Sequence, residues 1–245
     1  MMGKRILLAF LLLTSGCDID TFVPLAQFGG PAGVITGSVT YASPPPCTQN
    51  GEIVGAAVLF AFEERLLPPP EGLGTVPVAL SVVSGELLFR SVRSQLAFDP
   101  NGARLCPPAG SPSVTVTADY SLSPLPGGVY QIRGFYDYDG DFNPGFSMFN
   151  LPTAGDVGGG AIENPEAVLM GAAPRFRGVP LGDLDPDGVR RIPESGSLVE
   201  GVPVTLGLPL PLERPIFHVS AVADATFGNT DPANIVVPSD YQLNV

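Results

Sequence analysis

Alternating aspartates are the part of this chain best suited to chemistry. Asp183, Asp185 and Asp187 are separated by single residues, Gly188 follows directly, and Glu194 completes the run. Carboxylates at alternate positions can converge on one ion, the glycine permits a sharp turn, and the distal glutamate can supply two further oxygens. The spacing predicts a calcium-binding turn, and the alternative is an acidic turn that is only solvated.

This run has the ligand spacing of an EF-hand loop but not the surroundings of one. Arg190 stands where such a loop carries an apolar residue, Pro193 interrupts the entry to a following helix, and no amphipathic pattern flanks the run. We therefore expect a calcium turn between strands and not a pair of EF-hands.

A second acidic run has the same alternation without a distal glutamate. Its candidate ligands are Asp137, Asp139, Asp141 and Asn143, with Gly140 between them. These side chains could bind an ion alone or share one with the first run. The alternative is a solvated hairpin turn, for which Asp and Gly are the usual residues.

Other catalytic and metal-binding patterns are missing from the sequence. His218 is the single histidine and stands in an apolar run, and there is no C-x-x-C, H-E-x-x-H or G-x-S-x-G motif. We expect no zinc or haem site and assign no catalytic residue. The sequence does not exclude glycoside hydrolysis by a pair of carboxylates, although the absence of tryptophan disfavours a groove in which sugars stack on aromatic rings.

The N-terminus carries the marks of an export signal. Lys4 and Arg5 precede the apolar run Ile6–Leu13, which is too short to span a bilayer, and small residues lead to Cys17. The stretch Leu13–Cys17 resembles the lipobox of bacterial lipoproteins, in which signal peptidase II cleaves before the cysteine and the thiol is lipidated. The alternative is an ordinary secretory signal with an incidental cysteine.

The lipobox resemblance implies a cell-envelope lipoprotein, on the periplasmic side or at the cell surface. Residues 1–16 would be the signal peptide, and residues 17–32 the lipidated Cys17 with a short tether. Two or three acyl chains, palmitate among them, would hold the protein on the membrane permanently, because each buried methylene contributes about 0.8 kcal/mol.

Charge excludes one class of partner. Without Lys4 and Arg5 the chain keeps ten arginines and no lysine against 24 acidic residues, a formal charge of −14. A protein that binds nucleic acid needs cationic side chains that neutralise the phosphates, so we expect this protein not to bind nucleic acid. An acidic surface suits divalent cations instead.

Two cysteines remain beyond the lipobox, Cys47 and Cys106, and each stands in a proline cluster. Outside the cytoplasm an even pair most simply forms a disulfide, so we predict that they are bonded. Two free thiols are the alternative.

An alternation of period two dominates residues 33–245 and predicts an all-β fold, an antiparallel β-sandwich. The expected strands cover 35–42, 53–62, 76–83, 86–98, 113–122, 129–136, 198–208 and 215–222. The strand over Glu86–Phe98 is the ambiguous one, because four apolar residues there would also share one helical face. Between the strands, 137–197 is predicted to be a long irregular segment rich in Asp and Gly.

Short motifs resemble the transthyretin-like sandwich of the carboxypeptidase regulatory type. They are Ile35–Val39, Gly55–Val58 and Gly128–Phe135, followed by an Asp/Gly-rich turn over 136–144. The resemblance covers about residues 33–145 and implies an accessory or binding domain.

Together these patterns predict a membrane-anchored, non-catalytic β-sandwich that binds or scaffolds an unidentified protein or glycan and is stabilised by calcium. Two alternatives stay open. A carboxylate-dependent hydrolase would need an acidic cleft with perturbed pKa values, and a carrier of a small apolar ligand would need a large apolar pocket between the sheets.

Overall fold

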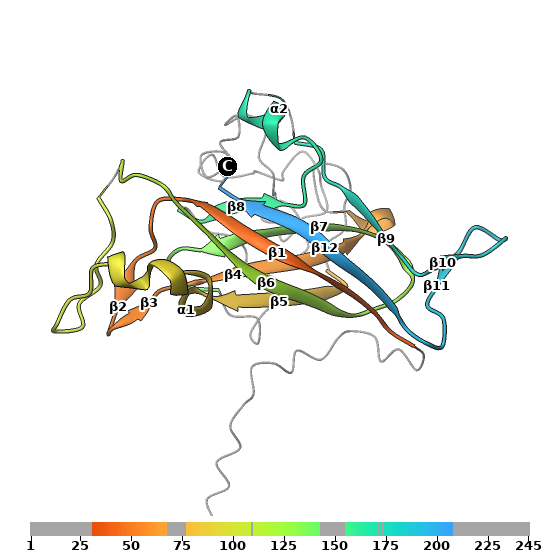
Figure 1. Ribbon diagram of the computed structural model, residues 1–245, viewed down its shortest axis with the longest axis horizontal. Coiled ribbons are helices and arrows are strands. Elements are labelled where there is room, and N and C mark those ends of the chain that lie inside the picture. The colour runs from red at the N-terminus through yellow and green to blue at the C-terminus, as the bar shows by residue number, and fades with distance from the viewer. Residues whose placement is uncertain are drawn as a thin grey trace, which may run out of the picture.

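The computed structural model describes residues 31–67, 77–108, 110–142, 155–170, 172 and 174–207, and about half of them belong to strands (Figure 1). The predicted all-β fold is confirmed. Cys17, Asn143, His218 and the strand expected over 215–222 lie outside the described residues. In chain order the elements are β1 (Gly33–Ser43), β2 (Thr48–Gln49), β3 (Glu52–Ile53), β4 (Ala56–Glu63), η1 (Glu64–Leu66), β5 (Ala79–Ser84), α1 (Gly85–Leu88), η2 (Arg90–Gln95), β6 (Val114–Leu125), β7 (Gly128–Asp137), β8 (Val157–Gly160), α2 (Pro165–Leu169), β9 (Gly178–Leu181), β10 (Asp183–Leu184), β11 (Arg190–Arg191) and β12 (Ser197–Leu206).

One eight-stranded sheet organises these elements. Its strands run in the order β5-β4-β7-β8-β12-β1-β6, and β9 pairs with the first half of β7. The pairs are antiparallel as predicted, except that β1 and β12 run parallel. This parallel pair brings the last described strand against the first, so both ends of the described chain contribute to one sheet.

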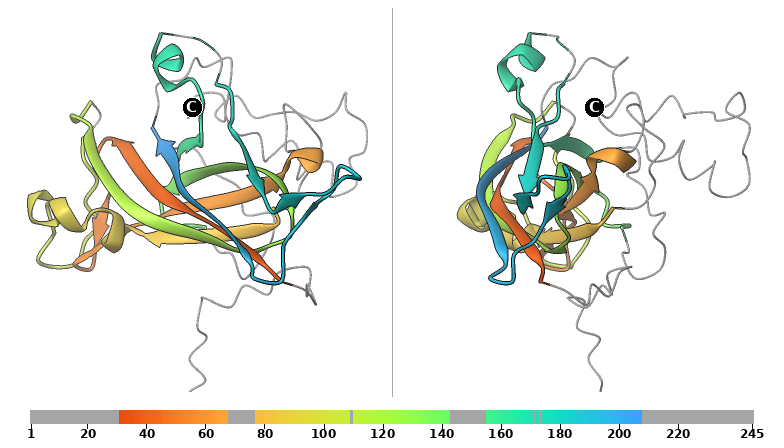
Figure 2. Two further views of the ribbon diagram at one scale, coloured as in Figure 1. Left: turned by 45° about the vertical axis from the view of Figure 1, so that its right-hand side comes forward. Right: turned by 90° about the vertical axis from the view of Figure 1, so that its right-hand side faces the viewer.

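The sheet curves until it is nearly cylindrical, so its two halves face each other as the layers of a sandwich do. Its end strands β5 and β6 come into contact, and a view turned by 90° shows the strands surrounding a common interior (Figure 2). The inward positions alternate along each strand, as Ile35, Val39 and Tyr41 do in β1, all of them buried. The apolar core therefore lies inside the curved sheet.

Glu86–Phe98 is not a strand, and that prediction is wrong. Most of its residues belong to α1 and η2. Helix α1 begins after Ser84, whose hydroxyl oxygen accepts a hydrogen bond from the Leu87 N–H (3.3 Å). Leu88 and Phe89 are adjacent in sequence, yet both are fully buried. A strand would point them to opposite faces, whereas the helical turn directs both into the core.

Phe89 completes an aromatic group inside the sheet. Its ring lies 5.0 Å from that of Tyr41 and 5.5 Å from that of Tyr136, in edge-to-face arrangements, and the Tyr41 and Tyr136 rings are 5.1 Å apart. Such pairs contribute about 0.5–1.5 kcal/mol beyond the area they bury. The short helix α1 therefore packs one end of the core.

Strand β4 is buried on both faces, as its continuous apolar sequence predicts. The outward residues Val58, Phe60 and Phe62 form a second cluster with Leu67 and with Phe135 of β7. This cluster lies on the opposite face of the sheet from the main core, so β4 and β7 form a layer between two apolar regions.

The predicted disulfide is confirmed, because Cys47 and Cys106 are bonded. An isolated antiparallel bridge between Thr48 and Leu105 continues the connection. The two proline-rich loops are therefore held together at one end of the sheet. Among the helices of the described residues, none is both long and apolar enough to cross a bilayer.

Candidate metal centre

Strand β7 ends in a tight acidic turn that is organised by its own first carboxylate. The side chain of Asp137 accepts hydrogen bonds from the N–H groups of Gly140 (2.9 Å), Asp141 (3.1 Å) and Phe142 (3.3 Å). Gly140 has a φ of +75°, a conformation that glycine adopts without a steric penalty. Alternating Asp and Gly therefore form a closed turn here, as these residue types favour.

The pairing of β7 with β8 brings a further carboxylate to this turn. Tyr136 is the partner of Val157, so the next residue of β7, Asp137, faces the residue before β8, Asp156. Asp156 accepts a hydrogen bond from the N–H of Tyr138 (2.7 Å). The strand pairing thus places Asp156 beside the start of the turn.

Three carboxylates meet at this point. One oxygen from each of Asp137, Asp139 and Asp156 lies within 4.8 Å of the other two, and this is the one such group of metal-binding side chains among the described residues. Asp137 and Asp156 are each only 4% exposed. The cluster concentrates negative charge in a largely dehydrated place, where charge is costly unless it is compensated.

The electrostatics of the turn reflect this crowding. Burial raises the pKa of Asp137 to about 6; the hydrogen bonds from Gly140 and Phe142 lower it, and neighbouring Asp139 raises it. The pKa of Asp141 is also raised, by burial and then by Asp139. A bound cation would oppose both effects, because it stabilises the ionised carboxylates.

The chemistry of the donors indicates which ions fit. All three side chains offer oxygen, which hard cations such as Ca²⁺ and Mg²⁺ prefer, whereas zinc sites normally include nitrogen or sulfur. Asp141 is next in the turn and could add a fourth carboxylate. The residues present therefore fit calcium, which accepts flexible sets of oxygen ligands.

The loops joined by the disulfide Cys47–Cys106 also contact the acidic turn. The guanidinium of Arg104 donates hydrogen bonds to the carbonyl oxygens of Tyr138 (3.3 Å) and Asp139 (3.1 Å), and the Tyr138 hydroxyl donates one to the Pro45 carbonyl (2.8 Å). Arg104 and Pro45 each stand two residues from a bonded cysteine. The disulfide, the two loops and the acidic turn thus form one connected unit.

The other predicted run folds as a separate hairpin, β10–β11. Its carboxylates are paired internally, since the guanidinium of Arg191 bonds to both Asp185 and Asp187 (2.7 Å to the latter). The hydrogen bond from Arg191 lowers the pKa of Asp187. Among the described residues, Asp183, Asp185, Asp187 and Glu194 do not gather three carboxylates at one point.

Of the predicted ligands, the structure therefore brings together Asp137 and Asp139, and it adds Asp156, which the sequence reasoning missed. The only signal was the glycine run that follows it, Gly158–Gly160, which makes up most of β8 between β7 and β12. A Cβ on Gly159 would lie 1.9 Å from the Thr205 carbonyl oxygen, so the strand needs residues without side chains. That need is visible only once the strand pairing is known.

Comparisons with other proteins add nothing to the assignment of this site. Searches against protein-family models, curated proteins and solved structures find no match for this chain.

Proposed function

We propose that this protein is an envelope lipoprotein, anchored through Cys17, whose β-domain is a non-catalytic binding or scaffold module stabilised by calcium. The anchor rests on the lipobox resemblance. The calcium site rests on one observation, the buried group of Asp137, Asp139 and Asp156 at the junction of β7 and β8.

The position of the cluster suits a structural ion. A cation shared by Asp137 and Asp156 would link the end of one strand to the start of the next, across the segment that separates them in sequence. It would also relieve the repulsion and burial that raise the pKa of Asp137. The domain would then be more stable and its acidic turn more rigid with calcium than without it.

The raised pKa of Asp137 is also the one observation that favours a hydrolase, because a carboxyl with a pKa near 6 beside another carboxyl can act as a proton donor. Access argues against that role. Asp137 is 4% exposed and directs its oxygens to backbone N–H groups of its own turn. A general acid must reach its substrate, so we favour the structural role.

Packing disfavours the apolar carrier. The interior of the curved sheet contains the rings of Tyr41, Phe89 and Tyr136 in mutual contact, together with the buried aliphatic residues of β1, β7 and β12. A carrier would need much of this space for its ligand.

Calorimetric titration of the purified protein with CaCl₂, after treatment with EDTA, tests the calcium part of the proposal. We expect saturable binding and a higher melting temperature in calcium than in EDTA. Magnesium is the matched control, because it demands a stricter octahedral geometry and should bind more weakly. Absence of both heat and a melting shift would refute the calcium site.

A further inference from the structure

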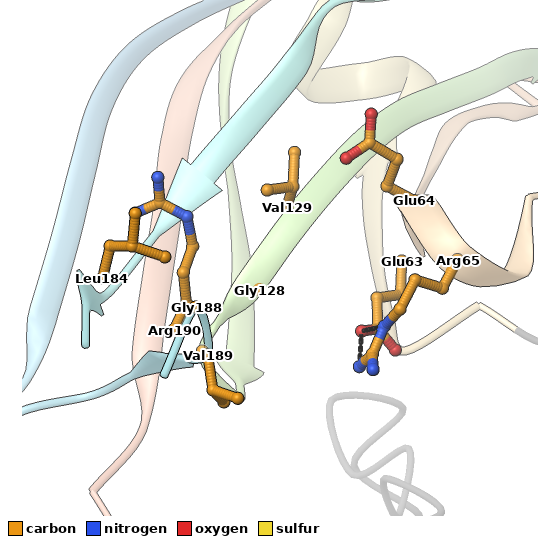
Figure 3. A pocket seen from close by; sticks show the side chains of 10 residues that line it. Glu63, Glu64, Arg65, Gly128, Val129, Leu184, Gly188, Val189 and Arg190 are labelled. Carbon is orange, nitrogen blue, oxygen red and sulfur yellow. Dashed lines mark hydrogen bonds and ion pairs between the residues drawn. The ribbon is translucent and has the colours of Figure 1, made fainter. Parts of the chain in front are cut away.

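A groove lies at the end of the sheet where β10 and β11 are found, away from the acidic turn. It has a volume of about 400 Å³ and separates the hairpin β10–β11 from the start of β7 and from η1 (Figure 3). Its walls comprise Glu63, Glu64, Arg65, Gly127, Gly128, Val129, Leu184, Gly188, Val189 and Arg190. This volume is within the usual range of small-ligand sites, roughly 300–1,000 Å³.

Two opposite charges line this groove, and neither has an ionic partner among the described residues. On one wall, Arg65 is bonded to Glu63, which leaves the neighbouring Glu64 with no hydrogen bond or ion pair to the described residues. On the other wall, Arg190 donates a hydrogen bond to the Gly182 carbonyl (2.8 Å), and no carboxylate of the described residues pairs with it. Val129 lies between the two charged side chains (Figure 3).

Apolar side chains line the same groove. Leu184 is 62% exposed and Val189 is 49% exposed, and both belong to the hairpin wall. Exposed branched aliphatic residues on a two-stranded hairpin gain nothing from the core, and their exposure next to a hollow marks a surface suited to an apolar group. Gly188 adds open backbone, since a Cβ there would have no atom within 4 Å.

The hairpin wall is held in place before any ligand arrives. A Cβ on Gly127 would lie 2.3 Å from the Arg190 carbonyl oxygen, so β11 packs directly on the backbone that leads into β7. Arg191 binds Asp185 and Asp187 across the hairpin. The alternating aspartates thus brace one wall, and a preformed groove loses less entropy on binding.

We propose that this groove binds short zwitterionic peptides with an apolar side chain. The peptide's ammonium group pairs with Glu64, its carboxylate pairs with Arg190, and its apolar side chain lies against Val129, Leu184 and Val189. The ligand needs both charges because Glu64 and Arg190 have opposite signs and no ionic partner within the described ranges. It needs an apolar side chain because Leu184 and Val189 are exposed beside them.

This inference rests on the binding role proposed above, but on neither the lipid anchor nor calcium. A negative calcium titration would not refute peptide binding by the groove. A groove that does not bind peptide would not refute the lipid anchor or the calcium site.

The test uses the purified protein, in detergent if it carries lipid, and three forms of the tripeptide Leu-Ala-Leu. One has free termini, one is N-acetylated and one is C-amidated, so that each blocked form lacks one charge. We expect saturable binding of the free peptide in the low-millimolar range or tighter, measured by calorimetry or ligand-observed NMR. Each blocked form should bind about two- to fivefold more weakly, as expected for a half-exposed charge pair.

Two variants assign the charges. Glu64→Gln should remove the difference between the free and the N-acetylated peptide, and Arg190→Gln should remove the difference between the free and the C-amidated peptide. Glu52→Gln and Arg90→Gln are the matched controls, because both residues are exposed and lie in β3 and η2, near the opposite end of the sheet from β10 and β11 (Figure 1). They should leave all three affinities unchanged.

Three results would overturn the proposal: no saturable binding of the free peptide, equal binding of all three forms, or wild-type discrimination in both Glu64→Gln and Arg190→Gln. Tighter binding of the C-amidated form would indicate a cationic ligand class instead, and tighter binding of the N-acetylated form an anionic one.

Discussion

The carboxylates of Asp137 and Asp156 lie within 4.8 Å of each other because Tyr136 pairs with Val157 in the adjacent antiparallel strands. Each of the two aspartates is 4% exposed. Strand β8 behind Asp156 has little side-chain packing of its own, since three of its four residues are glycine. Protonation of these two carboxylates, or binding of an ion to them, should therefore change the stability of the β7–β8 pairing at this end.

Asp156→Asn should abolish the stabilisation by calcium. At a calcium concentration about 100 times the Kd, the wild-type domain gains about 2.7 kcal/mol, which for a chain of this size raises the melting temperature by roughly 5–10 °C. The variant keeps an oxygen that can accept from Tyr138 but loses the charge that an ion requires. Melting curves in calcium and in EDTA measure both values.

Asp119→Asn provides the control for that variant, because Asp119 is exposed on β6 and has no part in the cluster. It should melt as the wild type does in both solutions. A full calcium shift in Asp156→Asn would show that the ion binds elsewhere.

The pH dependence without metal should run opposite to that of most proteins with paired carboxylates. Burial raises the pKa of Asp137 in the folded state to about 6, above its ordinary value of 3.8. The protonated form is favoured by folding, so its stabilisation is complete below about pH 4 and is lost as the pH rises through about 6. Chemical denaturation in EDTA at several pH values should show the free energy of unfolding falling across this range.

Asp137→Asn should flatten this part of the pH profile, because the neutral amide cannot ionise. Calcium should flatten or reverse it in the wild type, since a cation favours the ionised form. A wild-type profile in EDTA that instead rises between pH 4 and pH 6 would contradict the cause assigned to the pKa of Asp137.

Much of the fold can be predicted from the sequence, because the apolar residues at every second position of the long strands are the residues that are buried. Strands predicted over 35–42, 113–122 and 129–136 correspond to β1, β6 and β7, where the inward residues repeat at every second position. The disulfide was predictable from the number and setting of the cysteines. These features are local, or depend on composition alone.

Features that depend on non-local contacts were not predictable. The apolar residues Leu88 and Phe89 are compatible with a strand and with a helix. The helix forms because Ser84 caps α1 and because both side chains fit into the end of the core. Asp156 precedes a glycine run with no side-chain pattern, so nothing in the sequence pairs it with Asp137. The same holds for the parallel pairing of β1 with β12.

Asp187→Asn should leave the calcium response unchanged, although the D-x-D-x-D-G spacing predicts that it would abolish it. Asp187 is already bonded to Arg191, which also binds Asp185. An ion at the hairpin would have to displace this guanidinium. Calcium titration of the two variants side by side separates the two acidic runs. A response lost in Asp187→Asn and kept in Asp156→Asn would assign the ion to the hairpin.

Removing the disulfide should weaken both the fold and the calcium site. In the chain-entropy model, a bond that closes a loop with a sequence separation of 59 stabilises by about 4 kcal/mol. The double variant Cys47→Ser/Cys106→Ser should lose stability of that order in chemical denaturation. Its calcium affinity should also fall, because Arg104 and Pro45 hold the acidic turn from the bonded loops. An unchanged affinity in the folded variant would show that the turn is positioned without them.

Cys17→Ser should abolish lipidation if the lipobox is used, so the variant should lack the added lipid mass and keep its signal peptide. The thiol is the only group at that position that a diacylglyceryl chain can modify, and a serine would leave the precursor uncleaved by signal peptidase II. Fractionation of cells gives the location of the wild-type protein, and intact-mass measurement of the wild type and the variant gives the added lipid mass and the state of cleavage. Cys47→Ser/Cys106→Ser is the matched control, because it removes cysteines without touching the lipobox and should stay membrane-bound. A wild-type mass without lipid would mean that the first residues act as an ordinary secretory signal, and the binding and calcium properties of the domain would then belong to a protein released from the membrane.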